Sequence, residues 1–454
     1  MPGTDLRLLP ECEHTMNRLV LGLDPNQTKF YMLPDTTPWD PRSPDPRVRR
    51  LRQQLYWLNF ELLHGGIMKA APEETNFYLS VPDPRIVTES LGNEEEEFRE
   101  YLRERVGWTQ NQIETRIHFF KTPAVVAFPR DMAEPLGRDG RDRLVLGIGS
   151  DSDAWYAEPL RRLVAAYPGE FVLKVLPDVN TEGGDLSIVV MPEGNLGVIV
   201  GHHRILRYLE ARGGVPVKGR RIAPAEIEQA RAAYRKAFFG LEPLIVGEEG
   251  LTDPQLVTDE LFHADMVVNV LRGRSGVVAF VPSYREAPVD AITQAQLSEA
   301  VRDRVQAEYD AVAREFEGRG FRVVRLPLRD HPTRTPVQVG DFVDARTGRQ
   351  IVLLGKYPYH LDLPGGRNPQ RDLQASLERL ERSVGAWRLT ATPARWAQVE
   401  EDIRGVWKEL DAGGATPNPT FDMQARIYES EGIRVIPVPI YPTGEGGIHC
   451  LLLN

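Results

Sequence analysis

Apolar residues recur along this chain in stretches that begin with helical spacing and end as a short continuous apolar run. Residues 313–328 read AREFEGRGFRVVRLPL, and residues 425–440 read ARIYESEGIRVIPVPI. In each stretch the helical spacing stops at a glycine, and an apolar segment rich in valine and isoleucine follows. The pattern predicts an amphipathic helix that ends at the glycine and leads directly into a strand.

These two stretches agree at many positions without a gap, which indicates an internal repeat. A looser third copy, LRRLVAAYPGEFVLKVLPD, occupies residues 160–178, and two passages in the first third of the chain fit the same scheme with less agreement. Helix–glycine–strand passages also occur in unrelated α/β proteins, so the interpretation depends on the matching residues. We expect one large pseudosymmetric α/β domain whose repeated units close into a ring.

Glycine-rich turns follow two of the predicted strands and lead into second strands. One copy reads TEGGDLSIVV at residues 181–190, and the other reads EGGIHCLLLN at residues 445–454. Ser187 in the first copy occupies the place that Cys450 has in the second. In a ring of such units, the same turn would bring a different side chain to the axis from each unit.

The domain organisation follows from these repeats. We expect a loosely ordered N-terminal segment, residues 1–15, followed by a single domain over residues 16–454, because chain ends are the segments least held by a fold. The proline-rich residues 33–47 and the segment 329–349 are predicted to be surface loops.

Composition and charge restrict the functional classes. The chain has 454 residues, of which 41% are hydrophobic and 26% charged, and a formal net charge of −10. This negative balance argues against a general nucleic-acid binder. The longest apolar runs are too short to span a bilayer, and the N-terminus lacks the apolar segment of a signal peptide. We therefore expect a cytoplasmic protein with neither nucleic-acid nor membrane partners.

The first candidate reactive groups are a thiol, an imidazole and a carboxylate. Cys450 follows a glycine-rich turn, where small residues allow a substrate to approach the sulfur closely. His263 and Asp265 stand two apart in LFHADMVVNV, residues 261–270, which we expect to be a strand. Because side chains alternate along a strand, both would point to one face.

Two polar turns complete the pattern. TEGGD supplies Glu182 and Asp185, and the apolar stretch AVVAFPRDMAEP, residues 124–135, contains Arg130 and Asp131. In chain order the four motifs are FPRD, EGGD, HAD and GGIHC.

Together these motifs resemble those of the guanidino-group-modifying enzymes of the pentein, or α/β-propeller, superfamily. That family includes the peptidylarginine, arginine and agmatine deiminases and the amidinotransferases. Its motifs are an aromatic-x-Arg/Gln-Asp turn, an Asp/Glu-Gly-Gly turn, a His-x-Asp strand and a glycine-rich C-terminal turn that ends in cysteine. The resemblance covers residues 16–454 and implies a single pentein domain of five ββαβ units, which agrees with the internal repeat.

The resemblance also implies how a guanidino group would be held. A guanidinium is planar and cationic, so two carboxylates can grip it in a bidentate manner and fix the position of its carbon. Asp131 and Asp265 would be these carboxylates. Arg130 and Asp185 are further substrate-binding candidates. Asp185 suits a role in capping its own turn equally well, and Arg130 suits a salt bridge or a solvent-facing position.

The remaining residues would carry the chemistry. By resemblance, Cys450 attacks the guanidino carbon and forms a covalent thiouronium after ammonia leaves. His263 would protonate the departing amine and then activate water, and Glu182 would orient His263. His449, next to the cysteine, is expected to point away from it and to serve either packing or the support of a neighbouring site residue. Cys12 receives no role.

The sequence thus predicts a cysteine-dependent deiminase that converts a guanidino group to a ureido product and ammonia. The guanidino group would belong to arginine, agmatine or an arginine residue in a peptide. An amidinotransferase of the same fold and a non-catalytic pentein that binds a partner are the alternatives. Animal peptidylarginine deiminases use calcium, but this chain has no EF-hand-like loop and no zinc-ligand spacing, so no cofactor or metal is predicted. The oligomeric state stays open.

Overall fold

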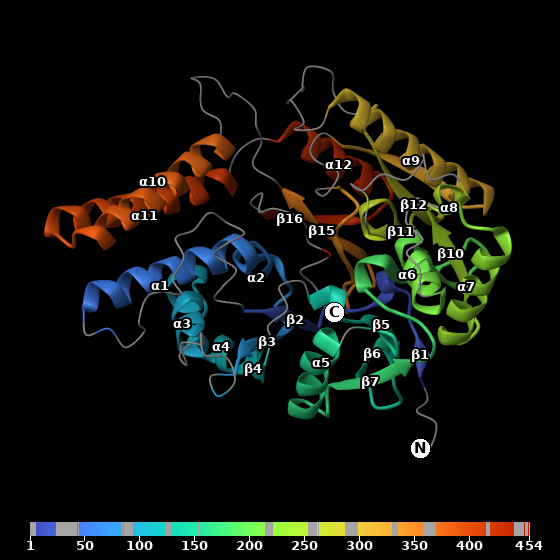
Figure 1. Ribbon diagram of the computed structural model, residues 1–454, viewed down its shortest axis with the longest axis horizontal. Helices are drawn as coiled ribbons and strands as arrows, with labels where there is room; N and C mark the ends of the chain where they lie inside the picture. The colour runs from blue at the N-terminus through green and yellow to red at the C-terminus, as the bar shows by residue number, and fades with distance from the viewer. Residues whose placement is uncertain are drawn as a thin grey trace.

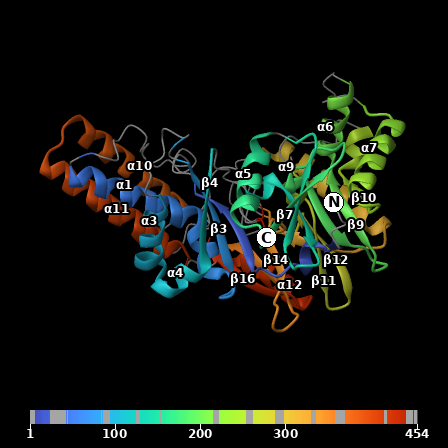
Figure 2. The same cartoon turned by 90° about the horizontal axis from the view of Figure 1, so that it is seen from below.

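In the part of the chain that the computed structural model describes, five small sheets form the centre, and most of the helices lie outside them (Figures 1 and 2). The protein is a mixed α/β chain. The structure describes residues 6–23, 43, 45–83, 85, 94–123, 129–152, 154–213, 221–252, 261, 263–286, 298–328, 335–356, 369–414, 418–439, 449 and 453.

Four of the sheets share one topology, in which an antiparallel hairpin is followed by a helical crossover to a parallel third strand. In the first, β5 (Glu134–Arg138) pairs antiparallel with β6 (Leu144–Gly149), and α5 (Ala154–Ala166) leads to β7 (Phe171–Leu176), which is parallel to β6. The strands of the other three follow the same order: β8 (Leu186–Val190), β9 (Leu196–Gly201) and β10 (Glu242–Val246); β11 (Asn269–Gly273), β12 (Gly276–Ser283) and β13 (Arg322–Pro327); β14 (Gly340–Val343), β15 (Gln350–Lys356) and β16 (Arg434–Pro439).

Helices connect the second and third strands of these sheets. The connecting helices are α6 (His202–Gly213) and α7 (Pro224–Ala237), then α9 (Glu299–Gly318), then α10 (Pro369–Leu389), α11 (Pro393–Gly414) and α12 (Pro419–Ser430). A short helix, α8 (Glu248–Thr252), follows β10. The helices α10 and α11 form a hairpin that extends away from the sheets beside the first helices of the chain (Figures 1 and 2).

The fifth sheet joins the two ends of the chain. Its strands β2 (Arg18–Gly22), β3 (Asn76–Pro82) and β4 (Ile117–Thr122) are parallel, and Leu453 forms an antiparallel bridge with Val20 of β2. The helical segments between these strands are α1 (Pro46–Phe60), η3 (Glu61–Gly65), α2 (Gly66–Ala70), α3 (Glu94–Tyr101), η4 (Leu102–Val106) and α4 (Gln110–Arg116).

Contacts between the sheets follow a cyclic order. β5 contacts β8, β8 contacts β11, and β11 contacts β15. β16 of the same sheet contacts α2, which leads into β3, and β2 contacts η5 (Pro129–Met132), which leads into β5. Strand contacts therefore link four of the sheets in a row, and α2 and η5 connect the fifth sheet to the two ends of that row.

The predicted helix–glycine–strand passages are confirmed. In the repeated stretches α9 is followed by β13 and α12 by β16, and the predicted glycines Gly320 and Gly432 have φ of 86° and 83°. A left-handed backbone of this kind ends a helix and is strained for residues with a side chain beyond Cα. The third copy, at α5 and β7, has the same order of elements.

Three expectations about local structure need correction. HAD does not belong to a strand: η8 (Ala264–Met266) is a 3-10 turn, and the strand begins only at Asn269. The segment 335–349 is not a simple surface loop, because residues 335–342 are buried and β14 lies within it. Residues 329–334, like most of 33–47, lie outside the described residues.

The N-terminal segment is the third correction. We expected residues 1–15 to be loosely ordered, but within the described part β1 (Arg7–Leu8) pairs with β5, and η1 (Glu11–Glu13) contacts β8, β11 and β14. Cys12 and His14 are each 1% exposed. Apolar and hydrogen-bonding contacts to several sheets therefore hold this segment in the interior.

Within the described residues, no helix combines the length and the apolar character needed to cross a membrane.

Candidate functional site

The candidate site is built from polar residues in the turns that lead into β5, β8 and β11, and from residues close to these turns. η5 precedes β5, η6 (Gly183–Asp185) precedes β8, and η8 precedes β11; η6 contacts both of the other turns. Gln338 precedes β14, and His449 precedes the bridge at Leu453. The segments that precede β5, β8, β11 and β14, together with His449, thus supply the residues of one candidate site.

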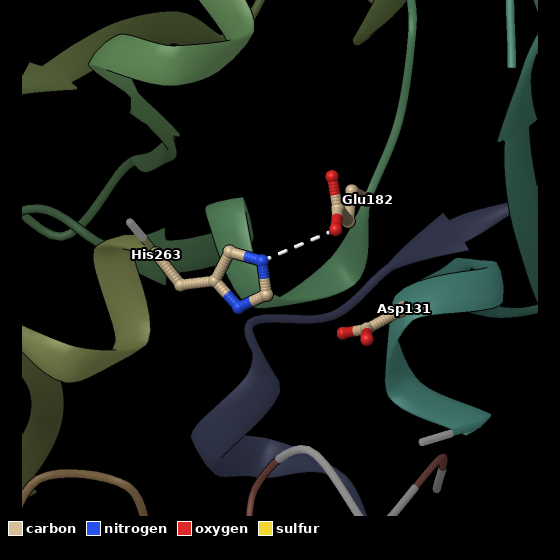
Figure 3. A group of neighbouring side chains, drawn as sticks. All are labelled: Asp131, Glu182 and His263. Atoms are coloured by element: carbon tan, nitrogen blue, oxygen red, sulfur yellow. Dashed lines mark hydrogen bonds and ion pairs between the residues drawn. The ribbon is translucent and has the colours of Figure 1, made fainter. Parts of the chain in front are cut away.

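Asp131, Glu182 and His263 form the innermost group. One ligand atom from each of these side chains lies within 4.8 Å of the others. The three side chains come from separate turns and converge on one space, and His263 Nε2 lies 3.2 Å from Glu182 Oε1 (Figure 3). Sequence reasoning selected all three, and the fold brings them together.

Two glycines make this approach feasible. A Cβ on Gly184 would collide with the imidazole of His263, and a Cβ on Gly183 would collide with the backbone carbonyl of Arg130. The EGGD motif therefore needs both glycines because the neighbouring turns pack directly against its backbone.

The pKa values of the two carboxyl groups, Asp131 and Glu182, are shifted in opposite directions. Burial raises the pKa of the Asp131 carboxyl to about 7, and the negative charges of Glu182 and Asp265 act in the same direction, while His263 opposes them. Burial also acts to raise the pKa of Glu182, but the hydrogen bond with His263 and the charge of Arg204 outweigh it and lower the pKa to about 2.

Asp131 is also poorly satisfied. Its Oδ1 is buried and accepts no hydrogen bond from the residues that the structure describes. A carboxylate oxygen that lacks a donor and lies next to the ionised Glu182 favours an incoming cation. Such a cation would supply the missing positive charge and the missing hydrogen bond.

Asp265 and Asp185 have different hydrogen-bond partners. Asp265 is buried, accepts a hydrogen bond from Gln338 Nε2 at 3.3 Å and lies 2.8 Å from His449 Nδ1. Asp185 accepts hydrogen bonds from the Ala264 N–H at 3.1 Å and from Arg204 Nε at 2.8 Å. Asp185 therefore ties η6 to η8 and to α6, which favours the structural of the two roles that its sequence allowed.

Arg130 has no exposed surface that a substrate could contact. Its guanidinium is fully buried, and it donates to Glu134 at 2.8 Å, to Glu11 at 3.1 Å and to the carbonyls of Gly183 and Leu186. With no exposed surface, it joins η5, η6 and the N-terminal segment. The substrate-binding role assigned to Arg130 is therefore corrected to a structural one.

Three residues near the site were not selected from the sequence. Arg204 of α6 pairs with Glu182 Oε2 at 2.5 Å, Tyr156 of α5 lies close enough for Asp131 and Glu182 to affect its hydroxyl, and Glu11 contacts His449 at 2.6 Å. Burial, reinforced by those carboxylates, raises the pKa of Tyr156 to about 12. None of the three belongs to a local motif, so only the tertiary contacts identify them.

Cys450 lies outside the described residues. The residue before it, His449, is described and is 6% exposed, with its ring between Glu11 and Asp265. The other cysteine, Cys12, is buried, and burial together with the nearby Asp341 and Glu13 raises its thiol pKa well above the usual value. A thiol of that kind is not a nucleophile at neutral pH.

Asp131, Glu182 and His263 also have the composition of a divalent-cation site. Three ligands would leave coordination positions open, so the group fits either a bound metal or an organic cation.

A scan against models of known protein families found no match, and a search of curated proteins found none either.

Proposed function

We propose that this protein is a cysteine-dependent hydrolase that deiminates a guanidino group to a ureido product and ammonia. The observation that carries the proposal is the convergence of Asp131, Glu182 and His263 from three separate turns on one acidic site, with Asp265 close enough for its charge to act on Asp131. A guanidinium matches such a site because it is planar, cationic and rich in N–H donors.

The arrangement of the sheets supports the pentein fold as the finer description. Four sheets repeat one ββαβ topology, Leu453 forms an antiparallel bridge with the fifth, and the contacts of the five follow a cyclic order. In a five-unit α/β propeller, equivalent corners meet at the axis, which would explain why turns from separate sheets bring the candidate residues together.

The proposed reaction has two stages. With Asp131 and Asp265 holding the guanidinium, the Cys450 thiolate forms a C–S bond to the guanidino carbon, and one C–N π electron pair moves to nitrogen. His263, oriented by Glu182, gives a proton to the departing nitrogen, the C–N bond breaks, and ammonia leaves. Water then attacks the thiouronium carbon while His263 accepts a proton, and the C–S bond breaks to release the ureido product.

Product analysis tests this proposal directly. Purified protein is incubated with arginine, agmatine or an amide-blocked arginine peptide, with and without calcium, and ammonia and ureido products are measured. Ureido product from one of them, absent in a Cys450→Ala preparation, would support the proposal and name the substrate. Transfer of the amidino group to an added amine would instead indicate an amidinotransferase. No product under any condition contradicts the proposal.

Guanidinium binding is expected to release a proton near pH 6. Asp131 has a pKa of about 7 when the site is empty, so about nine tenths of the carboxyls are protonated at pH 6 and few at pH 8.5. A cation favours the ionised form, so affinity should fall about tenfold per pH unit well below 7. Calorimetry of agmatine binding to Cys450→Ala, in buffers of different ionisation enthalpy, measures the release. Release that persists in Cys450→Ala/Asp131→Asn would contradict the assignment.

Removal of metal ions is expected to leave turnover unchanged. If the substrate cation occupies the Asp131–Glu182–His263 group, dialysis against a chelator should alter kcat/KM by less than about twofold, a change too small to represent a lost catalytic group. The measurement is turnover before and after chelation, with metal content determined in parallel. Loss of activity that a divalent metal restores would show that this group holds a metal instead.

A further inference from the structure

The N-terminal segment, residues 6–15, contacts strands of four of the sheets. β1 pairs with β5, and η1 contacts β8, β11 and β14, while Glu11 reaches His449. Five separate parts of the chain therefore meet around one short segment, although His449 and Glu11 stand near opposite ends of the sequence.

Glu11 uses both of its carboxylate oxygens. Oε1 lies 2.6 Å from His449 Nε2, and Oε2 accepts hydrogen bonds from Ser187 Oγ at 2.7 Å and from Arg130 Nη2 at 3.1 Å. The residue is 9% exposed. Burial favours its neutral form, but Arg130 and His449 outweigh it and hold the pKa of Glu11 well below its usual range.

His449 connects Glu11 to Asp265. Its Nδ1 lies 2.8 Å from Asp265 Oδ2, so the ring stands between two carboxylates. Both nitrogens donate only when the imidazole is protonated. Burial opposes the charge, but the charge of Glu11 and the hydrogen bonds to Asp265 and Glu11 overcome it and raise the pKa of His449 to about 10.

Other charged groups surround this pair. Arg130 lies on the far side of Glu11 and disfavours the His449 charge, and Asp341 of β14 is close to both. Burial and the charge of Glu11 raise the pKa of Asp341 to about 7. A small cavity of about 20 Å³ adjoins Glu11, Asp265 and His449, which leaves room for little more than a water molecule.

We propose that Glu11 is a positioning residue of the site, which holds His449 in place and, through it, fixes Asp265 for the guanidino group. Among the contacts of the described residues, His449 is the one that links Glu11 to Asp265. This inference rests on the proposed function.

The test compares Glu11→Gln with Glu13→Gln. Glutamine keeps the shape of the side chain and removes its charge, and Glu13 belongs to the same turn but pairs with the exposed Arg272 at 2.6 Å. With the substrate found for the wild type, Glu11→Gln is expected to lower kcat/KM by about 10- to 100-fold, the usual effect of losing a partner of a site ligand. Its alkaline limit of activity should move to lower pH. Glu13→Gln should match the wild type in both respects.

A second measurement does not need turnover. In protein labelled with ¹⁵N-histidine, the His449 signal, identified by its absence in His449→Gln, should remain that of an imidazolium up to about pH 9 in the wild type. In Glu11→Gln it should titrate at lower pH. If Glu11→Gln does not fold, Glu11→Asp, which keeps the charge but withdraws it from His449, should show smaller changes in the same direction.

The outcomes separate the two proposals. A shifted His449 titration with an inactive wild type would contradict the deiminase function and leave the Glu11–His449–Asp265 link standing. An unshifted titration with kcat/KM within about twofold of the wild type would overturn the positioning role of Glu11, because a group that fixes a site ligand cannot lose its charge without effect.

Discussion

Replacement of Cys450 by alanine is expected to lower turnover of the guanidino substrate by at least about 10⁴-fold. No other group can form the covalent intermediate, and loss of a nucleophile removes nearly all of the catalysis that its partners provide. The measurement is kcat for ureido-product formation in wild type and variant. Binding of the substrate should survive in the variant, because Asp131 and Asp265 remain.

The second cysteine provides the matched control. Cys12 is 1% exposed, and its thiol pKa is raised, chiefly by burial. Cys12→Ala should keep full activity and lose only about 1 kcal/mol of stability from the small cavity it creates. Equal loss of activity in both variants would indicate that the effect of Cys450→Ala comes from the fold rather than from the chemistry.

Replacement of Arg130 by methionine is expected to lower the free energy of unfolding by about 3–5 kcal/mol, a large share of the stability of an ordinary domain. Arg130 is fully buried and is the cation that faces both Glu11 and Glu134. Burial raises the pKa of Glu134 and the charge of Arg130 opposes that rise, while Arg130 and His449 hold Glu11 in its ionised form. Without Arg130 the buried cluster gains an unbalanced negative charge, and two carbonyls lose a donor.

Urea unfolding, followed by circular dichroism, measures this loss. Arg272→Met is the control, because Arg272 pairs with Glu13 at the surface and has a side chain that is 52% exposed. Its loss should be below about 1 kcal/mol. A loss of the same small size for Arg130→Met would show that the buried cluster does not depend on Arg130.

Local patterns predicted much of the framework. The stops at Gly320 and Gly432 are visible in the sequence because a helix that ends with a left-handed residue selects glycine. The turn residues Asp131, Glu182 and His263 could be selected because their motifs recur in a fixed order, and the fold places them together.

The failures have a common physical cause. His263 precedes a 3-10 turn and Asp265 lies within it, rather than both lying in a strand, because the apolar run after them is long enough to hide where strand pairing begins. Glu11 and Arg130 are joined only by contacts between distant segments. A buried carboxylate or guanidinium in a short irregular segment has the same local sequence as an exposed one, and its partners alone determine its role.

The central claim is that an acidic site presents a guanidino group to Cys450. A haloacetamidine, a cationic analogue whose halide a thiolate displaces to form a thioether, tests it most directly against a neutral haloacetamide of the same size. Mass spectrometry of digested protein should find Cys450 labelled faster by the cation, Cys12 unlabelled, and the preference lost in Asp131→Asn and Asp265→Asn. Equal rates for the two reagents at Cys450, or faster labelling of Cys12, would contradict the account.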